Sequence, residues 1–204
     1  MNNHHLQIHV YCIDGSTHTF VQDEPDAINL TLAELNPAML FSGERIVVGD
    51  GGSAVEFLPP LLARIDLVTD RYSVWDFPFA LGAPLELTEA EYAECLCGQK
   101  PSEPAGGQGD TPVFLDLQMV NGLQTFLWME VVGGLQASRL GRIYSLLKER
   151  RLVFGLRTGG VGILNLANLA HFDVHPKPPE PVNAVTVSHY ASERPRLRLR
   201  LAAH

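Results

Sequence analysis

The chain repeats a series of short segments at a spacing of about 107 residues, and this repeat constrains the fold more than any other feature. The run Arg45–Gly49 resembles Arg151–Gly155, and each run leads into a pair of glycines. The later run Leu62–Leu67 resembles Leu169–Val174 at nearly the same spacing. Because an internal repeat indicates a repeated architecture, the sequence predicts two similar structural units.

Each half opens with a pattern typical of a β-hairpin. Leu6–Ile13 alternates between apolar and polar residues and meets Asp14-Gly15, while Val113–Val120 meets Asn121-Gly122. These dipeptides tolerate positive φ angles, as tight hairpin turns require. A second apolar strand follows each turn, so we expect one hairpin in each half.

Apolar residues at helical spacing come next: Ile28, Leu32, Leu35 and Met39 in the first half, and Leu140, Ile143 and Leu147 in the second. Pro37 interrupts the first helix, and we expect Asn36 to cap a second short turn there. A strand, a glycine turn and a last strand complete each half. The predicted fold is α+β, with two tandem similar lobes, each a small mostly antiparallel sheet in ββαββ order with one helix.

The composition divides the chain into four regions. Residues 1–98 hold the first copy, an aromatic stretch and a helix from Glu89, which Thr88 and Glu91 start as a capping box. Residues 99–112 are rich in Gly, Pro, Ser and Gln, which indicates a flexible linker. Residues 113–181 form the second copy, and residues 182–204 form a C-terminal strand and a basic tail.

Charge and cysteine content bound the class of protein. The formal net charge of −8 argues against binding to nucleic acid or to an anionic membrane. No apolar run reaches the roughly 18 residues of a membrane span. The three cysteines are Cys12, Cys95 and Cys97, and an odd number favours free thiols in a reducing, cytoplasmic setting. No motif predicts a cofactor.

His171, Asp173 and His175 are the candidate metal ligands. At alternate positions of a strand they share one face, so imidazole and carboxylate groups are presented together. Residues two apart on a strand lie about 6.5 to 7 Å apart, however, so the three reach a single ion only with difficulty. A solvated or paired strand face is the alternative.

Both halves carry an aspartate at the same position, Asp66 and Asp173, which invites a catalytic interpretation. We expect instead that each carboxylate forms a weak surface pair with Arg64 or His171. The sequence therefore predicts no catalytic residue.

Tyr72, Trp75, Phe77 and Phe79 form an aromatic stretch with two interpretations. Aromatic side chains anchor interfaces, so the stretch fits a binding surface for a protein or small molecule. It fits equally well the core of a small two-part protein.

The leading functional hypothesis is a non-enzymatic protein-interaction or assembly module. Val182–Tyr190 and the alternating Arg196–Leu201 are strand patterns that suit addition to a sheet edge, in this chain or in another copy. One alternative is a metal-dependent enzyme with a site near His171, Asp173 and His175 between the lobes. Another is a small-molecule sensor that uses the stretch around Trp75.

Overall fold

The computed structural model describes residues 5–41, 43, 45–49, 52–70, 83–98, 111–131 and 136–176. The elements up to residue 98 are β1 (Leu6–Cys12), β2 (Thr17–Gln22), α1 (Pro25–Glu34), α2 (Pro37–Leu40), β3 (Ile46–Gly49), β4 (Ala54–Phe57), the 3-10 helix η1 (Pro59–Leu61), β5 (Leu62–Val68), β6 (Leu85–Leu87) and α3 (Glu89–Gly98). The remaining elements are β7 (Thr111–Met119), β8 (Gln124–Val131), α4 (Gln136–Leu147), β9 (Arg151–Gly155), β10 (Val161–Asn165), the 3-10 helix η2 (Leu166–Asn168) and β11 (Leu169–His175). The protein is mixed α+β with a large, mostly antiparallel sheet, and no described helix is long and apolar enough to cross a membrane.

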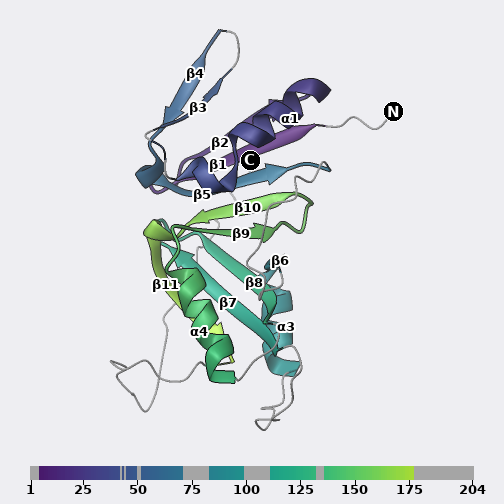
Figure 1. Cartoon of the computed structure of the whole chain (residues 1–204), viewed down its shortest axis with the longest axis vertical. Helices are drawn as coiled ribbons and strands as arrows, with labels where there is room; N and C mark the ends of the chain where they lie inside the picture. The colour runs from purple at the N-terminus through teal and green to yellow at the C-terminus, as the bar shows by residue number, and fades with distance from the viewer. Residues whose placement is uncertain are drawn as a thin grey trace, which may run out of the picture.

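Nine strands form one continuous sheet in the order β11-β7-β8-β6-β9-β10-β5-β1-β2, while β3 and β4 form a separate two-stranded sheet (Figure 1). All pairs are antiparallel except β6 with β9. The prediction of a separate small sheet in each half is therefore wrong. The first part of the chain (β1–β5) and the second part (β7–β11) share this sheet because β10 pairs with β5. In addition β6, which the sequence analysis missed, lies between β8 and β9.

Local sequence signals are confirmed where they concern turns and caps. Gly15 and Gly122 have φ angles of 85° and 83°, as their hairpin turns require. A new helix, α2, begins at Pro37 after the predicted break. The Thr88 amide donates to the Glu91 carboxylate (2.8 Å), and the Glu91 amide donates to the Thr88 hydroxyl (3.2 Å), so the capping box is present.

The linker prediction is wrong at its end. Thr111 and Pro112 belong to β7, which pairs with β8 from its first residue. The other residues of the proposed linker, 99–110, lie outside the described residues.

Strand pairing follows the same register in both parts of the chain. Gln7 pairs with Val68 and Phe114 pairs with His175, and the second pair has residue numbers 107 higher than the first. Each of these ladders has its register shift at the same point, between Tyr11 and Cys12 opposite β5 and between Leu169 and His171 opposite β7. The strands β5-β1-β2 thus pair in the same order and register as β11-β7-β8.

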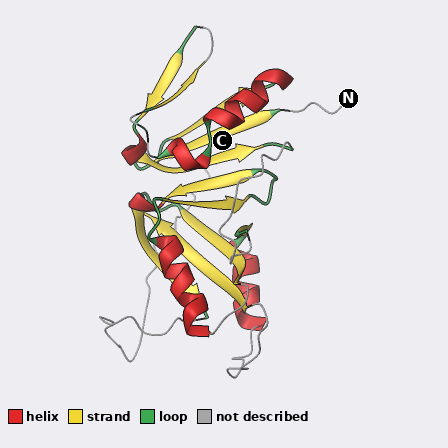
Figure 2. Ribbon diagram, viewed as in Figure 1, coloured by secondary structure: helices red, strands yellow, loops and turns green. Residues whose placement is uncertain are grey.

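The core is divided among three clusters because the sheet buries both faces. Helix α1 packs on β1 and β5 through Ile28 and Leu32, in a cluster that also includes Ile163 of β10. Ile143 of α4 packs on one face of β7 and β8. Tyr92 of α3 packs on their other face, so α3 and α4 flank the lower part of the sheet (Figure 2).

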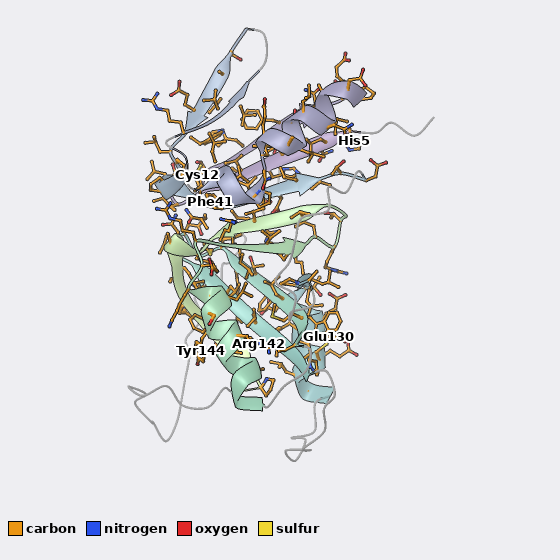
Figure 3. All side chains as sticks on the ribbon, viewed as in Figure 1. His5, Cys12, Phe41, Glu130, Arg142 and Tyr144 are labelled. Atoms are coloured by element: carbon orange, nitrogen blue, oxygen red, sulfur yellow. The ribbon has the colours of Figure 1, made fainter. Side chains whose placement is uncertain are left out.

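Side-chain amides and one arginine tie the two parts together. Asn121 donates to the carbonyl of Cys12 (2.8 Å), and Arg150 donates to the carbonyl of Phe41 (3.2 Å). Asn165 donates to the carbonyls of Pro59 and Leu62, both at 2.9 Å. Cys12 and Phe41, both labelled in Figure 3, thus each accept a hydrogen bond from the second part, and the junction satisfies backbone carbonyls that the strand ladders leave unpaired.

Two glycines with positive φ test how closely the parts approach each other. A Cβ at Gly160 (φ 101°) would overlap the carbonyl oxygen of Leu67, whereas nothing lies within 4 Å of one at Gly15 (φ 85°). Gly15→Ala should cost about 1–2 kcal/mol, the strain of a left-handed backbone. Gly160→Ala should cost about 3 kcal/mol or more, because steric overlap adds to that strain. Urea unfolding of both variants measures the difference, and equal losses would contradict the close packing at Gly160.

Candidate functional site

Strand β5 carries two charged residues inside the protein. Ile65 and Leu67 face the cluster under α1, so Arg64 and Asp66 face the opposite side of the strand. There they are buried, with exposed fractions of 6% and 4%. The expectation of a weak surface pair is therefore wrong for Arg64 and Asp66, because both faces of β5 are covered.

The Arg64 guanidinium donates to three side chains from three strands. Its Nε donates to Asp66 Oδ1 at 2.6 Å, on the same strand. Its Nη2 donates to Glu86 Oε1 of β6 at 2.7 Å, and its Nη1 donates to Thr125 Oγ1 of β8 at 3.1 Å. One side chain from the first part thus binds β8 of the second part and also β6, which lies between the two parts in sequence.

Aromatic rings complete this Arg64 network. The guanidinium carbon lies 4.8 Å from the centre of the Phe154 ring on β9 and 5.7 Å from that of Tyr11 on β1. The Phe154 ring in turn covers Gly162 of β10, where any Cβ would overlap it. The cation therefore lies among aromatic faces and carboxylates, both of which stabilise a positive charge.

Burial governs the ionisation of this network. It raises the pKa of Asp66 above its ordinary value, and the Arg64 charge together with hydrogen bonds from Arg64 and Tyr11 opposes the rise without cancelling it. Burial alone would lower the pKa of Arg64, but the Asp66 and Glu86 carboxylates raise it. Burial and the Asp66 charge also raise the pKa of Tyr11, so its hydroxyl stays protonated and donates to Asp66.

The chemistry of this arrangement is that of a structural junction. Arg64 has its donors directed at two carboxylates and a hydroxyl, and only 6% of it is exposed. Glu86 is the most exposed of its partners, with 21% of its side chain accessible. These residues hold three strands together, and the described contacts pair no nucleophile with a base.

The predicted metal ligands share a strand but are not assembled into a site. His171 is exposed on β11, whereas Asp173 and His175 are half-buried. The ring of His175 lies 6.4 Å from that of Tyr92, on α3. Among the residues that the structure describes, no group of three or more His, Cys, Asp or Glu side chains is placed to hold a metal ion.

A second aspartate lies opposite one of these residues. Asp116 of β7 pairs with Asp173 in the ladder and is buried, and it accepts a hydrogen bond from Gln124 at 2.7 Å. The sequence analysis missed Asp116, although an aspartate inside the apolar run of β7 was a visible signal. The same signal was available for Arg64 and Asp66, which interrupt an otherwise apolar strand.

Two predicted binding elements lie outside the described residues. These are the aromatic residues Tyr72, Trp75, Phe77 and Phe79, and the C-terminal segment 182–204. The binding role of each stays a prediction from the sequence.

The Arg64 network has a matched control on the protein surface. Arg64→Ala should destabilise the protein by about 3–5 kcal/mol, because it leaves the buried Asp66 carboxylate without its cation. The Arg45–Glu56 pair is just as short (2.6 Å), but its side chains are 61% and 54% exposed, so Arg45→Ala should cost at most about 1 kcal/mol. Chemical denaturation of both variants measures the two losses, and a similar cost for both would rule out a buried junction.

The raised pKa of Asp66 predicts a pH dependence of stability. The folded protein holds the Asp66 proton more tightly than the unfolded chain does. The contribution of Asp66 to the unfolding free energy is therefore lost as pH rises from the ordinary carboxylate range through the raised pKa. The difference in unfolding free energy between the wild type and Asp66→Asn should therefore fall with rising pH in this window. Urea unfolding across a pH series measures this difference. A difference that rises with pH would mean that Arg64 lowers the pKa of Asp66 instead.

Comparison with known proteins finds no family model, no curated protein and no solved structure that matches the chain. Functional inference therefore depends on the geometry of the fold itself.

Proposed function

We propose that this protein is a non-enzymatic interaction or assembly module that binds a protein partner through the open edges of its strands. The observation that carries this proposal is a concentration of exposed apolar side chains on the first part of the chain. Val21 on β2, Val47 on β3 and Val55 on β4 are exposed, as are Leu58 and Leu61 around η1. Exposed apolar side chains grouped on neighbouring elements mark interaction surfaces more often than scattered ones do.

The strands that carry these valines also have open edges. β2 is the last strand of the nine-stranded sheet, and β3 and β4 pair only with each other among the described strands. An open edge presents unpaired amides and carbonyls to which another strand can add. Backbone groups and apolar side chains are thus available together.

The interaction proposal also includes an internal duplication. The equal registers of β5-β1-β2 and β11-β7-β8 support two copies of one unit. In that view the contact between the parts, in which β10 adds to β5, is itself an example of strand addition between copies. The buried Arg64 network supports a structural use of the polar groups at this contact.

The C-terminal segment stays part of the proposal as an added strand. Val182–Tyr190 and Arg196–Leu201 have strand patterns, and the second carries arginines at alternate positions. Asp23, Glu24 and Asp26 are exposed directly after β2. Opposite charges at this edge support β2 as a place where such a segment adds.

A pair of valine variants tests the function. Val47→Lys places a charge on the exposed face of β3, and Val120→Lys does so at the end of β7, where the valine is equally exposed (58% and 57%). Val47→Lys should weaken association about tenfold or more, because a buried valine contributes roughly 1.5–3 kcal/mol, whereas Val120→Lys should not.

Size-exclusion chromatography with light scattering measures self-association of the full-length chain, and quantitative pull-down measures a retained partner. A wild-type protein that is monomeric at every concentration and retains no partner would refute the interaction function. So would equal behaviour of the two variants.

A further inference from the structure

We propose that the partner is a second copy of this chain, and that β4 of one copy pairs with β11 of the other in the register that joins β10 to β5 within one chain. This inference depends on the interaction function proposed above and names its partner. It follows from comparing two hairpins that occupy the same place in the two parts of the chain.

The β9–β10 hairpin shows what the contact between the two parts buries. It lies between β6 and β5, and Val161 and Ile163 of β10 join the apolar cluster under α1 of the first part. Leu164 of the same strand joins the cluster of the second part. A hairpin at this position is therefore covered from both sides.

In sequence, the β3–β4 hairpin precedes η1 and β5 just as the β9–β10 hairpin precedes η2 and β11. No other described strand pairs with β3 or β4, however. Val48 pairs with Val55 as Phe154 pairs with Gly162, so the two hairpins correspond residue by residue. Gly162 is buried and Val153 packs against the core, whereas Val55 is 38% and Val47 is 58% exposed. In Figure 1 this hairpin extends away from the large sheet. The first part thus exposes Val47 and Val55, whereas Ile46 and Phe57 of the same hairpin are buried in its own core.

Strand β11 provides the complementary edge. It corresponds to β5, the strand that receives β10, yet among the strands that the structure describes it is the terminal one of the nine-stranded sheet. Phe172 and Leu169 on β11 are only partly buried against the core, so an added strand would cover them.

The internal contact predicts the register of this pairing. Within the chain, Gly162 lies opposite Asp66 and Leu164 lies opposite Arg64. Transferred by the repeat, Val55 lies opposite Asp173 and Phe57 lies opposite His171. Glu56 then lies opposite Phe172, in the position that the buried Ile163 takes within the chain, and it brings its ion pair with Arg45 into the contact.

A second copy is required because one chain cannot close this contact. β11 is at one end of the nine-stranded sheet, and β4 lies beyond its other end, next to β1 and β2 (Figure 1). Each chain therefore offers one β4 edge and one β11 edge. Two reciprocal contacts close a two-fold dimer of four repeated units, and a contact that does not close continues as a filament.

Disulfide trapping between full-length chains tests the register. All chains carry Cys12→Ala, Cys95→Ser and Cys97→Ser, because the three native thiols are free. One chain adds Val55→Cys and the other adds Asp173→Cys, since residues directly opposite in an antiparallel pair have the Cα separation that a disulfide needs. The control mixes Val55→Cys with Ala170→Cys, an exposed position on β11 that lies three residues, or about 10 Å, along the strand from Asp173.

The matched mixture should form the mixed disulfide about tenfold faster than the control, because strand pairing raises the local thiol concentration. Equal rates in a protein that self-associates would overturn this pairing and leave the interaction function standing. A wild-type protein that neither self-associates nor retains a partner would remove both.

Hydrogen exchange on the wild-type protein gives an answer that does not depend on the variants. Amides of residues 54–57 and 169–175 should become more protected as protein concentration rises through the association range. Protection that does not change at either segment while the protein associates would refute the β4–β11 contact.

Discussion

The Arg64 guanidinium is the contact on which the arrangement of the sheet depends. It reaches Glu86 on β6 and Thr125 on β8, although β9 and β10 lie between β5 and β6 in the strand order. In a flat sheet β5 and β8 would be about 19 Å apart, since adjacent strands are spaced by roughly 4.8 Å. The contacts therefore require the sheet to curl between its two parts, so that β5 and β8 approach each other across one face. Because Gly162 has no Cβ, the end of the Phe154 ring can approach β10 closely while the ring lies beside the cation.

This network contributes specificity more than net stability. The desolvation of Arg64 and Asp66 offsets much of their attraction, so an apolar cluster of the same volume would stabilise the fold as well. An apolar cluster could pack against any short apolar strand. The Arg64 donors, in contrast, are all paired only when Glu86 of β6 and Thr125 of β8 both lie within hydrogen-bond distance. We interpret the buried charges as the device that fixes how the two parts are joined, in agreement with the amides of Asn121 and Asn165 at the same boundary.

The asymmetry between the two hairpins links this junction to the proposed assembly. The β9–β10 hairpin is held between β6 and β5, so its apolar residues are buried and its edges are paired. The β3–β4 hairpin has no such neighbours among the described strands and leaves Val47 and Val55 in solvent. In the proposed assembly, the exposed side chains of the β3–β4 hairpin are the surface that a second copy covers. Glu56 and Arg45, paired on this hairpin, are the kind of charged residues that keep an open edge from indiscriminate pairing.

The sequence by itself determined the local elements. The hairpin turns at Gly15 and Gly122, the break at Pro37 and the cap at Thr88 depend on neighbouring residues alone, so short-range patterns predict them. Only the tertiary structure decided that β10 pairs with β5, that β6 inserts beside β8, and that Arg64 is buried. Alternation along β5 indicates two faces but not whether the polar face meets solvent or another part of the chain. That depends on contacts between residues some 20 to 100 positions apart, such as Arg64 with Glu86 and Thr125 and Leu67 with Val161, which no local pattern encodes.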